Sequence, residues 1–263
     1  MSIVRGDRPS ILVVGDANRP EFSNLVPTLK TTADCWYFTQ LEPGIAWLNK
    51  APWQPELILL VQSQPGEIGD AEVRRLQTAA PLSGMCAVLG SWCEGETRSG
   101  RPWPGVRRCF QHEWPLLWRA ELRRKAGGEA PLWTLPATTS DEERLLAGSR
   151  LPGELPAQGS IAVVAGSRES TGALSDACRA GGWTVASGDA NPAVILWDTT
   201  IDKARNVQQV AAIKAQWGGA PVIALVTFPR PGDTACIIAA GIDAVLGKPF
   251  LLDHLFAEMR RII

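Results

Sequence analysis

Residues 222–250 read VIALVTFPRPGDTACIIAAGIDAVLGKPF, which is two apolar strands with a helical stretch between them. The first strand ends in Thr227, and the second is followed by Lys248. An earlier apolar run in the chain ends in Asp198. In a doubly wound parallel sheet, groups that follow the strands meet beyond the carboxyl ends of the strands. The sequence therefore predicts that these three polar side chains converge at one edge of a sheet.

The surrounding segment, 160–263, alternates strands with helices along its length. The expected strands are 161–165, 184–187, 193–197, 222–227 and 244–246, and the expected helices are 168–181, 203–217, 233–240 and 251–262. This alternation predicts a parallel sheet with right-handed crossovers. Only about five residues, 188–192, separate the second and third strands, too few for a helical crossover. We expect that one helix is lost or reduced to an extended connection.

The N-terminal half repeats the same order of elements. Its expected strands are 11–14, 35–39, 56–62, 85–89 and 106–111, with helices near 21–31, 43–49, 70–80 and 114–125. The fold class we predict is α/β, with two flavodoxin-like domains that each have a five-stranded parallel sheet and helices on both faces. The predicted domains are 9–125 and 160–263. Between them, 126–159 is predicted to be a proline-marked linker with one short helix, because Ser140 and Glu143 have capping-box spacing.

Composition and charge exclude several classes of protein. The net charge is −1, so no basic surface indicates nucleic acid or an anionic membrane. No apolar run approaches the roughly 20 residues of a membrane span. The six cysteines include no CxxC pair and do not form a disulfide framework, so we expect a cytoplasmic protein. No glycine-rich phosphate-binding fingerprint is present, and we expect no cofactor and no metal.

With Asp198, Thr227 and Lys248-Pro249 each at the end of a strand, residues 160–263 resemble the receiver domain of two-component response regulators. The resemblance implies that Asp198 stands where the family accepts a phosphoryl group. It implies that Lys248 stands where the acyl phosphate is stabilised and Thr227 where a phosphate oxygen is bound.

The same resemblance requires an acidic pair after the first strand, because that pair holds Mg²⁺ in the family. Ala165 and Gly166 occupy the two positions, and Glu169 comes several residues later, where a helix is expected to begin. A lone carboxylate is a poor ligand set for Mg²⁺. We therefore expect Asp198, Thr227 and Lys248 to be a vestigial phosphoacceptor site in which Asp198 and Lys248 form an ion pair.

The N-terminal half is further from the family pattern. Asp16 follows its first strand, and a turn or helix-capping role is expected for it. Gln62 stands near the acceptor position, and Gly90-Ser91 near the threonine position. The segment 111–115, QHEWP, stands where lysine-proline would belong. This half is predicted to be a degenerate receiver that cannot be phosphorylated.

The loop 92–104 has no place in a minimal receiver and lies between the fourth and fifth expected strands. It is rich in charge, glycine and tryptophan, and loops on rigid scaffolds often carry function. The residues that mark it as a possible functional loop are Cys93, Glu94, Glu96 and Arg98, together with His112. Three interpretations stay open: a zinc site with Cys109, a Cys93–His112 enzyme, or an interaction surface held by its tryptophans.

The predicted function is that of a non-catalytic tandem pseudo-receiver that acts in signal transduction, where its partners are other proteins of a signalling pathway. The resemblance implies docking through about 226–250, and a homodimer through that face is possible. We expect no enzyme activity and no phosphorelay of the usual Mg²⁺-dependent kind. The alternative is an enzyme, or a small-ligand or metal-binding protein, that uses Cys93–Pro104 and His112.

Overall fold

The computed structural model describes residues 8–95, 103–140, 143–144, 147, 159–186, 191–200, 203–227 and 229–263, without the side chains of 203–207 and 231. The chain divides into two compact units, 1–148 and 149–263. None of the helices in the described part of the chain has the length and apolar composition of a membrane span.

The first unit is built on one parallel five-stranded sheet. Its strands are β1 (Ser10–Val14), β2 (Asp34–Phe38), β3 (Leu57–Gln62), β4 (Gly84–Leu89) and β5 (Arg107–Phe110). They lie in the order β2-β1-β3-β4-β5, with every neighbouring pair parallel. This order is the flavodoxin-like one, so the predicted fold class is confirmed for this half.

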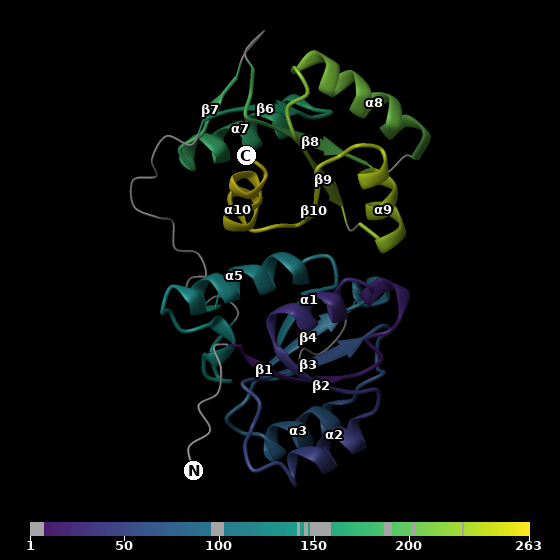
Figure 1. The fold of residues 1–263 in the computed structure, drawn as a ribbon, viewed down its shortest axis with the longest axis vertical. Helices are drawn as coiled ribbons and strands as arrows, with labels where there is room; N and C mark the ends of the chain where they lie inside the picture. The colour runs from purple at the N-terminus through teal and green to yellow at the C-terminus, as the bar shows by residue number, and fades with distance from the viewer. Residues whose placement is uncertain are drawn as a thin grey trace. The chain divides into compact units, whose positions relative to one another are not determined.

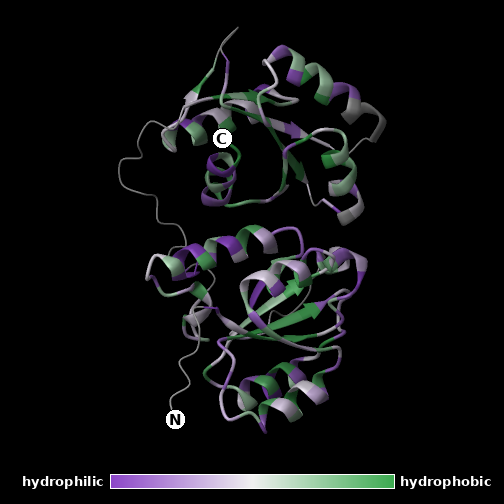
Figure 2. Cartoon of the chain, viewed as in Figure 1, coloured by the Kyte–Doolittle hydropathy of each residue, from purple (hydrophilic) through white to green (hydrophobic). Residues whose placement is uncertain are grey.

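Helices cover both faces of this sheet (Figure 1). They are α1 (Leu25–Thr32), α2 (Leu41–Leu48), α3 (Asp70–Ala79) and α5 (Trp114–Ala126), with the short turns η1 (Pro20–Phe22) and η2 (Ser91–Cys93). Strand side chains alternate between the faces, so Ile11 and Val13 pack with α1 and α5, whereas Leu12 and Val14 pack with α2 and α3. The central strands β1 and β3 are therefore buried along their whole length and are mostly apolar (Figure 2).

The second unit repeats this architecture. Its strands are β6 (Ser160–Val164), β7 (Thr184–Val185), β8 (Val194–Thr199), β9 (Val222–Thr227) and β10 (Ala244–Lys248). Its helices are α7 (Arg168–Ala180), α8 (Lys203–Gln216), α9 (Pro231–Ala239) and α10 (Leu252–Ile262). The strand order β7-β6-β8-β9-β10 is the same flavodoxin-like order, and all pairs are parallel.

One crossover differs between the two units. In the first unit, α2 connects β2 to β3. In the second unit, the described part of the connection, residues 186 and 191–193, contains no helix. β7 is also shorter than the predicted 184–187, with only two residues. The spacing argument from the sequence therefore agrees with the described residues of this connection.

The segment predicted as a linker begins by packing on the first unit. After α5, the turn η3 (Leu132–Thr134) places the Trp133 indole in the core beside Trp118, with ring centroids 5.3 Å apart. Gly84 lies against the Trp133 carbonyl, since a Cβ on this glycine would be only 2.1 Å from that oxygen. Further along, Ser140 and Glu143 form the expected reciprocal capping hydrogen bonds.

Candidate functional site

The carboxyl edge of the second sheet carries the predicted trio. β8 is buried from Val194 to Trp197 and becomes partly exposed at Asp198, where the strand leaves the core. On the neighbouring strands, Thr227 and Lys248 are the last residues of β9 and β10 and lie opposite each other in the register. All three side chains are thus placed at one edge because their strands end there.

Asp198 and Lys248 form a direct ion pair. The Lys248 Nζ donates to Asp198 Oδ1 at 2.5 Å, and the side chains are 31% and 19% exposed for lysine and aspartate, respectively. The ion pair expected between these residues is present. Half-buried charges are stabilised by such a partner, because each would otherwise lose hydration without compensation. Thr227 is exposed beside Lys248.

The positions for the acidic pair hold no carboxylate. Within 160–169, the described turn from β6 into α7, Glu169 is the one acidic residue. Hydrogen bonds from its own backbone N–H and from the Ser167 hydroxyl lower the pKa of Glu169, so its carboxylate serves the first turn of α7. Of the three positions that hold acids in the receiver family, only the one at Asp198 holds an acid here; Ala165 and Gly166 occupy the other two. These residues do not fit Mg²⁺, which prefers several oxygen ligands in octahedral geometry.

Sheet register identifies the equivalent positions in the first unit. Val164 pairs with Trp197, one residue before Asp198, and its counterpart Val14 pairs with Leu60. The acceptor position is therefore Val61. Gln62, which we expected near this position, is the next residue along the strand, where the side chain points to the opposite face.

The same register locates the other two positions. Gly90 follows Leu89 as Thr227 follows Val226, and Gln111 follows Phe110 as Lys248 follows Gly247. These pairs are at corresponding places in the two sheets. The first unit thus has valine, glycine and glutamine where the second has aspartate, threonine and lysine.

Gln62 has a structural role at the end of β3. Its side chain is fully buried, its Oε1 accepts from the Ile68 backbone N–H at 3.1 Å, and its Nε2 lies 3.7 Å from Cys93 Sγ. The amide therefore ties the loop after β3 to the turn η2.

Asp16 stabilises a turn, as expected. Its Oδ1 accepts from the Asn18 backbone N–H at 3.2 Å, and its Oδ2 lies 3.6 Å from Arg19 Nε. Short acids commonly form such turns with the backbone two residues on. Arg19 extends the contact to Glu67, with NH1 2.8 Å from Oε1.

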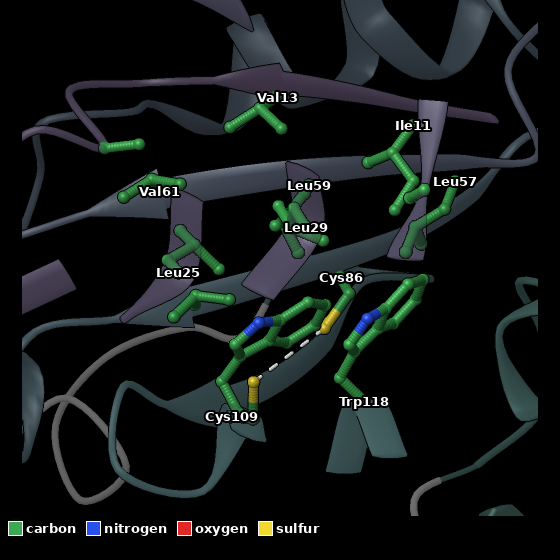
Figure 3. Close-up of a cluster of buried hydrophobic side chains, with 14 of the residues drawn as sticks. Ile11, Val13, Leu25, Leu29, Leu57, Leu59, Val61, Cys86, Cys109 and Trp118 are labelled. Carbon is green, nitrogen blue, oxygen red and sulfur yellow. Dashed lines mark hydrogen bonds between the residues drawn. The ribbon is translucent and has the colours of Figure 1, made fainter. Parts of the chain in front are cut away.

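The 92–104 loop is only partly described, and Glu96 and Arg98 lie outside the described residues. Cys93 is 0% exposed and packs in the core beneath α2 and α3, whereas Cys109 packs on the opposite face of the sheet. Cys109 Sγ lies 3.9 Å from Cys86 Sγ (Figure 3). The zinc interpretation, which needs Cys93 and Cys109 together, is therefore wrong. Among the described residues, no group of three or more His, Cys, Asp or Glu side chains could hold a metal ion.

The rest of this loop region is placed as follows. Trp92 is 76% exposed, next to half-buried Glu94. His112 stacks parallel to Phe110 with ring centroids 5.8 Å apart, and burial lowers its pKa to about 4. The imidazole is therefore neutral at pH 7. Glu113 accepts from the Phe110 N–H at 2.7 Å, and burial raises the pKa of its carboxyl.

The structure also shows a cavity that the sequence did not identify. It has a volume of about 370 Å³ and lies beyond the carboxyl ends of β1, β2 and β3. Its lining includes Val14, Gly15, Asp16, Arg19, Glu67 and Glu72. The signal available in the sequence was topological: in this strand order the connections diverge between β1 and β3, and ligands of doubly wound sheets bind at such a point.

No family model and no curated protein sequence matches this chain. Similar solved structures include a response regulator from Thermotoga maritima, with 19% identity, 42% of this chain and 98% of that chain covered, and a TM-score of 0.35. A putative pilus assembly-related protein from Burkholderia pseudomallei is 13% identical, with 42% and 93% covered and a TM-score of 0.36. The receiver domain of a sensor histidine kinase from Pseudomonas aeruginosa, solved with a magnesium ion in its active-site cleft, is 22% identical, with 40% and 96% covered and a TM-score of 0.33. The strand order of each unit is by itself flavodoxin-like.

Proposed function

We propose that this protein is a tandem pseudo-receiver that acts in signal transduction by binding other proteins. The proposal rests on the residues at the carboxyl edge of the second sheet. Lys248 is paired directly with Asp198, while Ala165 and Gly166 stand where Mg²⁺ would need carboxylates. Phosphoryl transfer depends mainly on neutralising the charge of the transferred group. With the metal ligands gone, the remaining pair stabilises the loops instead of supporting that transfer.

The first unit supports the same proposal by a different loss. Val61, Gly90 and Gln111 provide neither a carboxylate to accept a phosphoryl group nor a cation to stabilise it. The first unit keeps the fold and its apolar core. This supports a role in binding rather than in phosphoryl transfer.

The enzyme alternative is not favoured by the described residues. A nucleophilic thiol must be accessible and activated, and Cys93 is fully buried beside Gln62. The position of neutral, partly buried His112 is explained by its packing on Phe110.

For the docking face we propose the region from the end of β9 through β10, about 226–250, as the resemblance implies. Ile238 on α9 is an exposed apolar side chain within it. A signalling protein or a second copy of this chain would bind there. All six cysteines are free thiols, which supports a reducing, cytoplasmic location.

The proposal is tested by incubating the protein with acetyl phosphate and Mg²⁺ and measuring the intact mass. The wild type is expected to stay unmodified. The matched variant Ala165→Asp/Gly166→Asp restores both acids, and at Gly166 a Cβ has no neighbour within 4 Å. This variant should gain Mg²⁺ binding, measured by calorimetry. Modification of the wild type that Asp198→Asn abolishes would overturn the proposal.

A further inference from the structure

We propose that the cavity of the first unit is a binding site for a small organic cation, one with an ammonium or guanidinium group on an apolar stem. The proposal is independent of the pseudo-receiver function and would give this unit a ligand input. The volume of the cavity, about 370 Å³, falls within the roughly 300–1,000 Å³ range of small-molecule sites.

The floor of the cavity is apolar. It is formed by Val14 and Val61, from the ends of two central strands, together with Leu41 and Ile68. Gly15 allows the chain at the end of β1 to lie close to the end of β3. Its φ is +117°, and a Cβ at this position would lie 2.1 Å from the Val61 carbonyl oxygen. A preformed apolar floor suits the hydrocarbon stem of a ligand.

The rim of the cavity carries more negative than positive charge. Asp16, Glu67 and Glu72 supply three carboxylates, and Arg19 is the one cation among the lining residues. Concave sites walled by low-dielectric protein concentrate the field of such charges. This excess favours a positively charged ligand and disfavours phosphates and other anions.

The carboxylates are also held in place by the protein. Glu67 Oε2 accepts from the Ser63 N–H at 2.8 Å, and Glu72 Oε2 accepts from the Gly69 N–H at 2.6 Å. Each carboxylate has further lone pairs with which to accept from a ligand. Arg19 spans Asp16 and Glu67 and shows by its own contacts that this rim accepts a guanidinium.

Isothermal titration of the full chain with agmatine and with putrescine tests the proposal, with 1,4-butanediol and succinate as neutral and anionic probes. We expect both amines to bind and both other probes to fail. Glu72→Gln should weaken amine binding about tenfold to a hundredfold, the usual range for a hydrogen bond to a charged group. Arg19→Gln, which frees the carboxylates, should strengthen it.

Asp176→Asn is the matched control, because it removes one acid from an exposed site in the second unit. It should leave amine binding unchanged. Folding of each variant is checked by its thermal unfolding. The proposal fails if neither amine binds to wild type or Arg19→Gln, if Glu72→Gln binds as the wild type does, or if the diol binds equally well.

Discussion

The indole of Trp133 stacks on the indole of Trp118, with centroids 5.3 Å apart and an interplanar angle of 22°. Trp118 also stacks on Trp114, so three rings in a row close one face of the first core. The buried carboxylate of Glu121 accepts from the Leu132 N–H at 2.6 Å and is paired with Arg107 at 2.8 Å. Residues after α5 therefore complete this core and do not merely connect two domains.

Trp133→Ala is expected to destabilise the first unit by about 3–5 kcal/mol, the usual cost of removing a large buried aromatic ring. The measurement is urea unfolding of the full chain, followed by circular dichroism. Trp92→Ala is the matched control: its indole is exposed, so its effect should stay within about 0.5 kcal/mol. Equal effects of the two substitutions would contradict the packing role of Trp133.

The contact of Trp133 illustrates what the sequence could and could not predict. Strands and helices were predictable because apolar spacing is local, and the trio at 198, 227 and 248 was predictable because each residue lies at or next to the end of a strand. The glycines and prolines after α5 correctly marked the end of a helix. They carried no information on whether the chain would return to the core.

The candidate site shows the same division. Asp16 and Arg19 come from the loop after β1 and Glu67 comes from the loop after β3, and no periodicity links the two loops. The alternation of side chains along β5 predicts that Cys109 and its two neighbours face opposite sides of the sheet. It does not predict the place of Cys93, which only the assembled sheet shows to lie on the face opposite Cys109. Strand pairing likewise fixes the register, and this register places Val61 rather than Gln62 at the position that corresponds to Asp198.

His112 allows a test of pH dependence. His112 has a folded pKa of about 4, compared with about 6.5 in an unfolded chain. The unfolded state binds the proton more readily than the folded state. The contribution of His112 therefore leaves the free energy of unfolding unchanged above pH 6.5 and lowers it as the pH drops from 6.5 to 4. The total loss is about 3 kcal/mol, at about 1.4 kcal/mol per pH unit. His112→Phe keeps a ring on Phe110 and should remove this part of the pH dependence.

Unfolding free energies between pH 4 and 7 measure this difference. Glu113 has a raised pKa and acts in the opposite direction, but it is present in every protein compared. Parallel wild-type and His112→Phe curves would show that the imidazole is not desolvated.

Thiol reactivity separates the buried from the accessible cysteines. Cys86, Cys93, Cys109 and Cys178 are buried, and Cys35 and Cys236 are partly exposed. Burial raises the pKa of Cys178 to about 11, and the contact with Cys86 together with burial raises that of Cys109. Brief labelling with a maleimide at pH 7, followed by peptide mapping, should modify only Cys35 and Cys236. All six should react in urea. Rapid labelling of Cys93 in the folded protein would revive the enzyme alternative.

The Asp198–Lys248 pair can be measured with a double-mutant cycle. Asp198→Asn and Lys248→Met should each loosen the edge of the second sheet, because each leaves one half-buried charge without its partner. The double variant should be less damaged than the sum of the two. The coupling is expected between about 1 kcal/mol, as for exposed pairs, and about 3 kcal/mol, as for buried ones. Hydrogen exchange of peptides covering β8 and β10 reports this locally. Strictly additive effects would mean that the pair contributes no stability, and that the retained lysine and aspartate need another explanation.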